Sequence, residues 1–149
     1  PTKQAMYIEQ GVIAWQGGDK AGALEVFEKA YALDTRYTGA AAYVAAGHII
    51  TGDVPTAKAI LQEAFGTTTV DEPSLIPAYY EIKDWDNLLT LLELRARNRN
   101  DATSSFQLAS AYAESGSRAD AIRVVRQTIA TYPEAAAQGA AFLKQLGAN

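Results

Sequence analysis

The chain repeats itself with a nearly fixed period. The segment from Gly18 to Ala30 returns as the segment from Gly52 to Ala64, an offset of 34 residues, and each copy opens on a Gly-Asp pair. Fainter copies begin at Lys83 and at Gly116. A period of this length indicates stacked pairs of short helices, because one such pair cannot bury its own apolar face and needs a neighbouring pair to cover it. The repeat therefore constrains the fold more than any other feature of the sequence.

The apolar residues predict nine helices and no strand. Within the first copy, Ala23, Phe27 and Ala30 recur at steps of three and four residues, which places them on one face of a helix. Each Gly-Asp pair ends one helix with glycine and caps the next with aspartate. We expect helices over residues 5–16, 20–33, 39–50, 55–65, 73–82, 85–97, 101–115, 118–131 and 134–146.

One interval interrupts this regular pattern. Residues 66–73 combine glycine, three threonines and proline, so we expect a connector that acts as the hinge of the chain. Pro77 follows inside the next helix and would bend that helix if it lay beyond the first turn. The third repeat is therefore expected to be irregular.

Composition excludes several classes of function. The net charge is −4 and the sequence pI is near 5.0, which argues against nucleic acid as a partner because phosphate binding needs a basic surface. The chain has no cysteine, so disulfides, thiolate metal sites and cysteine nucleophiles are excluded. No apolar run approaches the roughly 20 residues that cross a bilayer, so this segment is not expected to insert into a membrane. Since it starts with Pro1 and not Met, we expect it to be part of a longer polypeptide.

These residues resemble the tetratricopeptide repeat (TPR) pattern of small, aromatic and Gly-Asp positions. Repeat one supplies Tyr7, Gly11, Gly18, Asp19, Ala23, Phe27 and Ala30. Repeat two supplies Val44, Ala45, Gly52, Asp53, Ala57, Leu61 and Ala64. Repeat four supplies Leu108, Ala109, Tyr112, Gly116, Ala121 and Pro133. Repeat three keeps Leu75, Tyr79 and Leu92 but has Leu88 and Arg95 where small residues are usual.

The resemblance implies an all-α fold, a right-handed superhelix of antiparallel helix pairs forming one domain over residues 1–149. The repeats would occupy residues 4–37, 38–68, 69–101 and 102–135, followed by a capping helix over 134–147. Small residues such as Ala23, Ala57 and Ala121 are expected where paired helices approach most closely, because a larger side chain there would force them apart.

The resemblance also implies a function, namely a scaffold module that binds a segment of a protein partner in a concave groove. The inner-face positions that it assigns to partner binding are Ile8, Val12, Trp15, Tyr43, Ala46, Ile49, Ile50, Tyr80, Phe106, Gln107 and Ser110. The same face would carry Gln16, Ala42, Ser74, Glu81 and Glu114. For the aromatic residues Trp15, Tyr43 and Tyr80, the alternative role is packing between repeats. TPR domains that hold chaperone C-termini use lysines and asparagines in this groove, and the absence of these residues here excludes that subtype.

No pattern in the sequence indicates catalysis. His48 is the only histidine, and we expect it to pack or to form hydrogen bonds between helices. Paired acids such as Asp71 and Glu72 are expected to cap helices and to be solvated in turns. We find no nucleophile, metal cluster or phosphate loop, so the sequence predicts a protein that is not an enzyme and has no cofactor or metal.

A second function is also open. The C-terminal sequence from Pro133 to Leu146, after Leu108 to Tyr112, resembles repeats attached to bacterial multi-spanning glycan polymerases and ligases of the O-antigen type. In that case the chain would be an extracytoplasmic appendage of a larger membrane protein. If it is not attached to such a protein, it could be cytoplasmic. Membrane helices upstream of this segment would distinguish the two.

Overall fold

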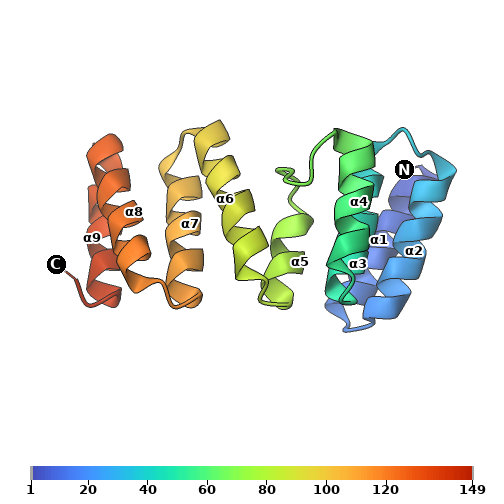
Figure 1. The fold of residues 1–149 in the computed structure, drawn as a ribbon, viewed down its shortest axis with the longest axis horizontal. Helices are drawn as coiled ribbons and strands as arrows, with labels where there is room; N and C mark the ends of the chain where they lie inside the picture. Colours follow the sequence, from blue (N-terminus) through green and yellow to red (C-terminus); the bar gives the residue numbers. More distant parts are fainter. Residues whose placement is uncertain (1, 149) are drawn as a thin grey trace. The chain divides into compact units, whose positions relative to one another are not determined.

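A computed structural model describes residues 2–148, which form helices joined by turns and, between residues 65 and 75, by a longer connector (Figure 1). The helices are α1 (Lys3–Gln16), α2 (Lys20–Leu33), α3 (Thr38–Ile50), α4 (Val54–Phe65), α5 (Leu75–Glu81), α6 (Trp85–Arg99), α7 (Ala102–Glu114), α8 (Arg118–Thr131) and α9 (Ala136–Gln145), with a 3₁₀ turn η1 (Pro133–Ala135) before α9. Residues 2–148 contain no strand. The all-α prediction is confirmed, and the expected helix ends lie within about two residues of the observed ones.

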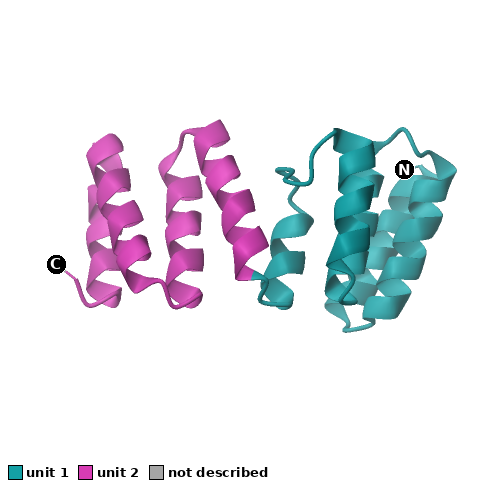
Figure 2. Ribbon diagram, viewed as in Figure 1, with its two compact units in different colours: residues 1–84 teal, residues 85–149 magenta. Residues whose placement is uncertain are grey.

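The helices group into two compact units (Figure 2). Unit 1 comprises residues 1–84 with α1 to α5, and unit 2 comprises residues 85–149 with α6 to α9. The expected third repeat, residues 69–101, crosses this boundary, because α5 packs against α3 whereas α6 packs against α7. The connector at residues 66–73, expected to be the hinge, lies inside unit 1 instead, since α5 follows it and docks on α3.

Small residues set the helix spacing in unit 1. Gly11 of α1 lies against the ring of Phe27 in α2, and a Cβ on Gly11 would overlap that ring. Phe27 is fully buried, as are Ala23 of α2 and Ala57 of α4. The predicted close approach of paired helices is thus observed. Any larger side chain at these positions would separate the helices.

Both Gly-Asp turns of unit 1 have the geometry that their sequence predicts. Gly18 and Gly52 have φ of +87° and +92°, in the left-handed region where glycine carries no steric penalty. Asp19 Oδ1 accepts a hydrogen bond from the Gly22 amide at 2.9 Å, and Asp53 caps α4 in the same way. At the third turn, Lys83 takes a φ of +56° directly before Asp84. The turn geometry therefore persists where the glycine is replaced.

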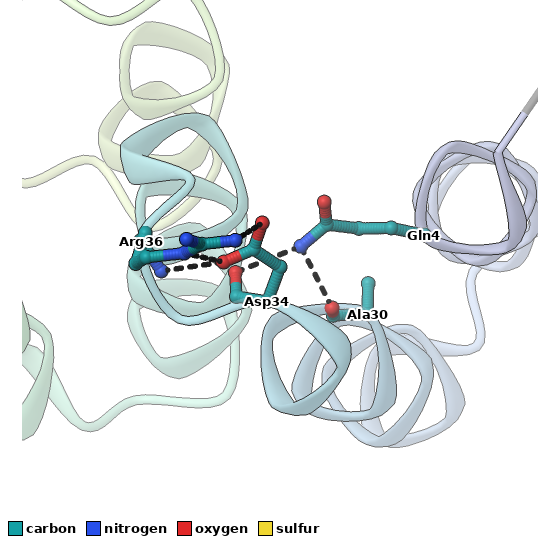
Figure 3. Close-up of polar contacts among 4 residues, drawn as sticks. All are labelled: Gln4, Ala30, Asp34 and Arg36. Atoms are coloured by element: carbon teal, nitrogen blue, oxygen red, sulfur yellow. Dashed lines mark hydrogen bonds and ion pairs between the residues drawn. The ribbon is translucent and has the colours of Figure 1, made fainter.

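Hydrogen bonds join the start of α1 to the end of α2 (Figure 3). Gln4 Nε2 donates to the carbonyl oxygens of Ala30 and Asp34, both at 3.0 Å. The carboxylate of Asp34 in turn accepts from Arg36 Nε at 3.0 Å. The last carbonyls of a helix have no partner within it, so Gln4 supplies hydrogen bonds that α2 cannot make for itself.

Unit 2 has its own apolar core. The core combines leucines of α6 with residues of α7 and α8, namely Leu88, Leu91, Leu92, Ala109, Ala121, Val124 and Val125. Helix α9 packs against α8, and the ring of Phe142 in α9 stacks on that of Phe106 in α7, with centroids 6.1 Å apart. Arg118 Nε donates to the Leu146 carbonyl oxygen at 2.6 Å, which ties the end of α9 to the start of α8.

Candidate functional site

Unit 1 contains a groove of about 450 Å³ between α1, α3 and α5. Its lining combines aromatic, aliphatic and proline side chains with few polar groups: Val12, Trp15, Gln16, Tyr43, Pro73, Ser74, Pro77 and Glu81. We call this set the unit 1 groove. Concave sites with mostly apolar walls and a few convergent polar groups are typical of ligand-binding surfaces.

Helical spacing explains how each element contributes to the unit 1 groove. Val12 and Trp15 are three residues apart on α1, and Pro77 and Glu81 are four apart on α5, so each pair shares one helix face. Pro77 is the third residue of α5 and lies in its first turn. The amide hydrogens of that turn have no partner inside the helix, so the proline removes no helical hydrogen bond there and gives no reason for a bend.

Glu81, the last residue of α5, contacts both α1 and α2 at one edge of the groove. Trp15 Nε1 donates to Glu81 Oε1 at 3.1 Å, and Lys20 Nζ lies 3.4 Å from Glu81 Oε2. The side chains of Lys20 and Glu81 are 46% and 33% exposed, so water screens this ion pair. Glu81 thus offers a carboxylate to solvent while α1 and α2 hold it in place.

Tyr43 belongs both to the core and to the unit 1 groove. Its ring centroid lies 5.1 Å from that of the buried Phe27, with the planes tilted by 35°. The same side chain also borders the groove. The two roles left open for Tyr43 by its sequence therefore do not exclude each other.

A polar atom in the groove lining has no protein partner. Ser74 is 8% exposed, and its Oγ forms no hydrogen bond in the described structure. A buried hydroxyl without a partner costs about 1 to 3 kcal/mol. The groove therefore contains a polar group whose hydrogen bonding is incomplete.

Acidic side chains gather next to the groove. Asp71 and Glu72 directly precede Pro73 in the connector. Burial raises the pKa of the Glu72 carboxyl, and the neighbouring negative charge of Asp71 raises it further. Both acidic residues therefore belong to the connector that reaches the groove at Pro73.

The structure brings part of the predicted binding set together. Val12, Trp15 and Tyr43 line the unit 1 groove, as do the adjoining predicted positions Gln16, Ser74 and Glu81. The two groove residues that the sequence analysis missed are Pro73 and Pro77. Their four-residue spacing beside a connector was the available signal. Ile8 and Tyr80 are partly buried outside this lining.

Four predicted binding residues are core residues instead. Ala46 and Ile49 of α3 are fully buried, Ile50 is 3% exposed, and Phe106 of α7 is 5% exposed. The adjoining Ala42 is fully buried as well. Because α3 is covered by α2, α4 and α5, most of its surface is inaccessible and only Tyr43 reaches the groove.

Unit 2 has a different groove, of about 420 Å³, between α6, α7 and α8. From α7 it is lined by Ser105, Leu108 and Tyr112, and not by the predicted positions Gln107 and Ser110, which are partly buried on another part of that helix. This groove is more polar and contains Glu93, Arg97 and Arg123. Tyr112 donates to Glu93 Oε1 at 2.6 Å, and this hydrogen bond raises the pKa of the Tyr112 phenol.

His48 lies between two acidic side chains at the junction of three helices. Its Nε2 is 3.6 Å from Glu28 Oε1 of α2, and its Nδ1 is 4.0 Å from Oδ2 of Asp53, the residue that caps α4. Within residues 2–148, no three His, Cys, Asp or Glu side chains cluster as a metal ion would require. Nor does any helix in that range combine the length and apolarity needed to cross a membrane.

Comparisons with known proteins identify the fold. No family model matches the chain, and no curated protein is similar to it in sequence. Among solved structures it is similar to a thermophilic TPR protein from Thermus thermophilus, at 18% identity and a TM-score of 0.54 over 87% of this chain and 75% of the other. It is also similar to MamA AMB-1, at 20% identity and a TM-score of 0.50 over 97% and 83% of the two chains. A further MamA structure gives 19% identity and a TM-score of 0.51 over 87% and 73%.

At these identities the likeness concerns the fold and not the ligand. It agrees with the repeat in the sequence, the antiparallel helix pairs and the Gly-Asp turns between them. The chain therefore has the all-α, helix-pair fold of a tetratricopeptide repeat protein.

Proposed function

We propose that this chain is a protein-interaction module and that it binds a short segment of a partner protein in the unit 1 groove. The observation that carries the proposal is the position of Trp15 and Tyr43 on facing helices of one groove that also contains two prolines. Large aromatic side chains in a water-excluding pocket supply most of the binding energy at protein interfaces.

The dimensions of the groove favour a short segment over a folded domain. A volume of about 450 Å³ accommodates a few side chains, not a flat interface. Pro73 and Pro77 carry no backbone N–H, so this wall offers apolar contact without unsatisfied donors.

A peptide-display selection against the folded chain tests the proposal. Peptides enriched on the parent protein are expected to bind Trp15→Ala at least about tenfold more weakly, as for a hot-spot residue. Ile13→Ala is the matched control, because Ile13 lies on the same helix, is 60% exposed and does not line the groove. Circular dichroism establishes that both variants are folded.

Two results would overturn the proposal. One is a selection that enriches no peptide over the background of the immobilisation surface. The other is a set of enriched peptides that bind the folded Trp15→Ala variant as tightly as the parent.

A further inference from the structure

The charge of the chain is distributed unequally between its units. Residues 1–84 contain six basic and eleven acidic residues, a net charge of −5, whereas residues 85–149 contain seven basic and six acidic residues, a net charge of +1. Unit 1, which contains the unit 1 groove, therefore carries the net negative charge of the chain. Charge complementarity governs which partners approach a surface and which are repelled.

Within the groove, the charge is concentrated at one carboxylate. Glu81 is the acidic residue of the lining, and no lysine or arginine lines the groove. Its Oε1 is occupied by the indole N–H of Trp15, while its Oε2 faces Lys20 from outside the groove. The carboxylate and the indole ring are thereby held next to each other, which is the combination that binds the charged end and the apolar stem of a basic side chain.

We propose that the partner segment carries a basic side chain, whose charged group binds Glu81 while its stem lies against Trp15 in the place of Lys20. This inference rests on the proposed function and adds the chemistry of the ligand to it. Arginine fits better than lysine, because a guanidinium stacks on an indole ring and is more weakly hydrated than an ammonium group.

Lys20 acts as an internal competitor in the free protein. It lies 3.4 Å from Glu81 and is 46% exposed, so the pair is a solvated surface contact. Such pairs are weak, because water screens the charges and ordering two long side chains costs entropy, so a ligand with additional contacts displaces Lys20. The contact shows that a cation fits beside Oε2, and its weakness makes the position exchangeable.

Two acidic residues of the connector also favour a basic ligand over an acidic one. Asp71 and Glu72 place two more carboxyl groups directly before Pro73, and burial, followed by repulsion from Asp71, raises the pKa of Glu72. A bound cation would reduce that repulsion, whereas an acidic segment would increase it. The surroundings of the groove therefore select against acidic ligands as well as for basic ones.

The test uses blocked single amino acids as probes, so that it does not depend on finding the partner. N-acetyl-arginine methylamide is titrated into the ¹⁵N-labelled full chain, with the glutamine and glutamate analogues in parallel. The readout is the indole N–H signal of Trp15, and the signal of Trp85, the other tryptophan, is the internal reference. The arginine compound is expected to shift the Trp15 signal, and the other two are not.

Two substitutions should change this affinity in opposite directions. Glu81→Gln keeps an acceptor for the Trp15 indole but removes the charge, and should weaken binding about threefold to tenfold. Lys20→Met removes the competitor and should strengthen binding by up to about fivefold. The matched controls Glu63→Gln and Lys58→Met make the same charge changes outside the groove lining and should leave the affinity unchanged.

The outcomes separate this inference from the proposed function. Equal shifts with the arginine and glutamine compounds, or an unchanged affinity in Glu81→Gln, overturn the inference. Selected peptides that need Trp15 but lack basic residues also overturn it, while leaving the proposed function intact. Arginine binding at Glu81 with no peptide enriched in the selection would instead confirm the cation site and overturn the proposed function.

Discussion

The indole N–H of Trp15 donates a 3.1 Å hydrogen bond to Glu81 Oε1, joining residues 66 positions apart in the sequence. The bond connects the end of α1 to the end of α5 within unit 1. It fixes the orientation of the tryptophan ring at the edge of the groove. The same contact therefore contributes to the fold and to the candidate binding site.

Trp15→Phe is expected to lower the free energy of unfolding by about 0.5 to 1.5 kcal/mol, because the variant retains most of the ring packing but loses the donor. Urea titration followed by circular dichroism measures the change. Glu81→Gln keeps an acceptor for the indole and should lower the free energy of unfolding by a smaller amount. A Trp15→Phe variant as stable as the parent would show that this hydrogen bond makes no net contribution.

Gly11→Ala is expected to destabilise the chain by about 1 to 3 kcal/mol, because the new methyl group overlaps the fully buried ring of Phe27. Gly39→Ala is the control, since the nearest side chain there is that of Tyr37, which is 50% exposed and can move aside. Thermal unfolding of the two variants gives the comparison. Similar melting temperatures would contradict the close packing of α1 on α2.

Phe106→Ala is expected to lower the free energy of unfolding by about 3 to 5 kcal/mol, because the side chain is only 5% exposed and its removal would leave a cavity. The partner-contact role expected from the sequence predicts no such loss. A double-mutant cycle with Phe142→Ala should give a coupling of about 0.5 to 1.5 kcal/mol for the stacked rings. Additive effects of the two substitutions would show that α9 does not stabilise α7 through this pair.

Lowering the pH should destabilise the N-terminus of α7. The amide of Ser104 donates to Asp101 Oδ1 at 2.7 Å, and this bond lowers the pKa of the Asp101 carboxyl. A folded-state pKa below the unfolded value means that the stabilisation is present above the unfolded pKa, near 3.9, and is lost as the pH falls through the folded pKa.

Asp101→Asn supplies the matching variant, because asparagine still caps a helix but does not titrate. Its unfolding free energy should fall less than that of the parent when the pH is lowered from about 5 to about 2. The measurement is urea unfolding across that range. Parallel curves for parent and variant would exclude Asp101 from the acid response.

The sequence alone determined the helices and the turns between them. Apolar spacing, the left-handed glycines Gly18 and Gly52 and the capping aspartates act over a few residues, so they are visible in the sequence without knowledge of the neighbours. The period of 34 residues then indicated helix pairs that must cover one another.

Only the tertiary structure decided which face of each helix remains accessible. Ile49 and Tyr43 lie on the same helix, and the repeat pattern predicts both in the groove, yet Ile49 is fully buried while Tyr43 borders the unit 1 groove. Pro73 and Pro77 complete the groove because α5 docks on α3, and the same docking places α5 in unit 1, which ends at Asp84. Burial depends on which neighbouring helix covers a side chain, a long-range property that the local pattern of a repeat does not specify.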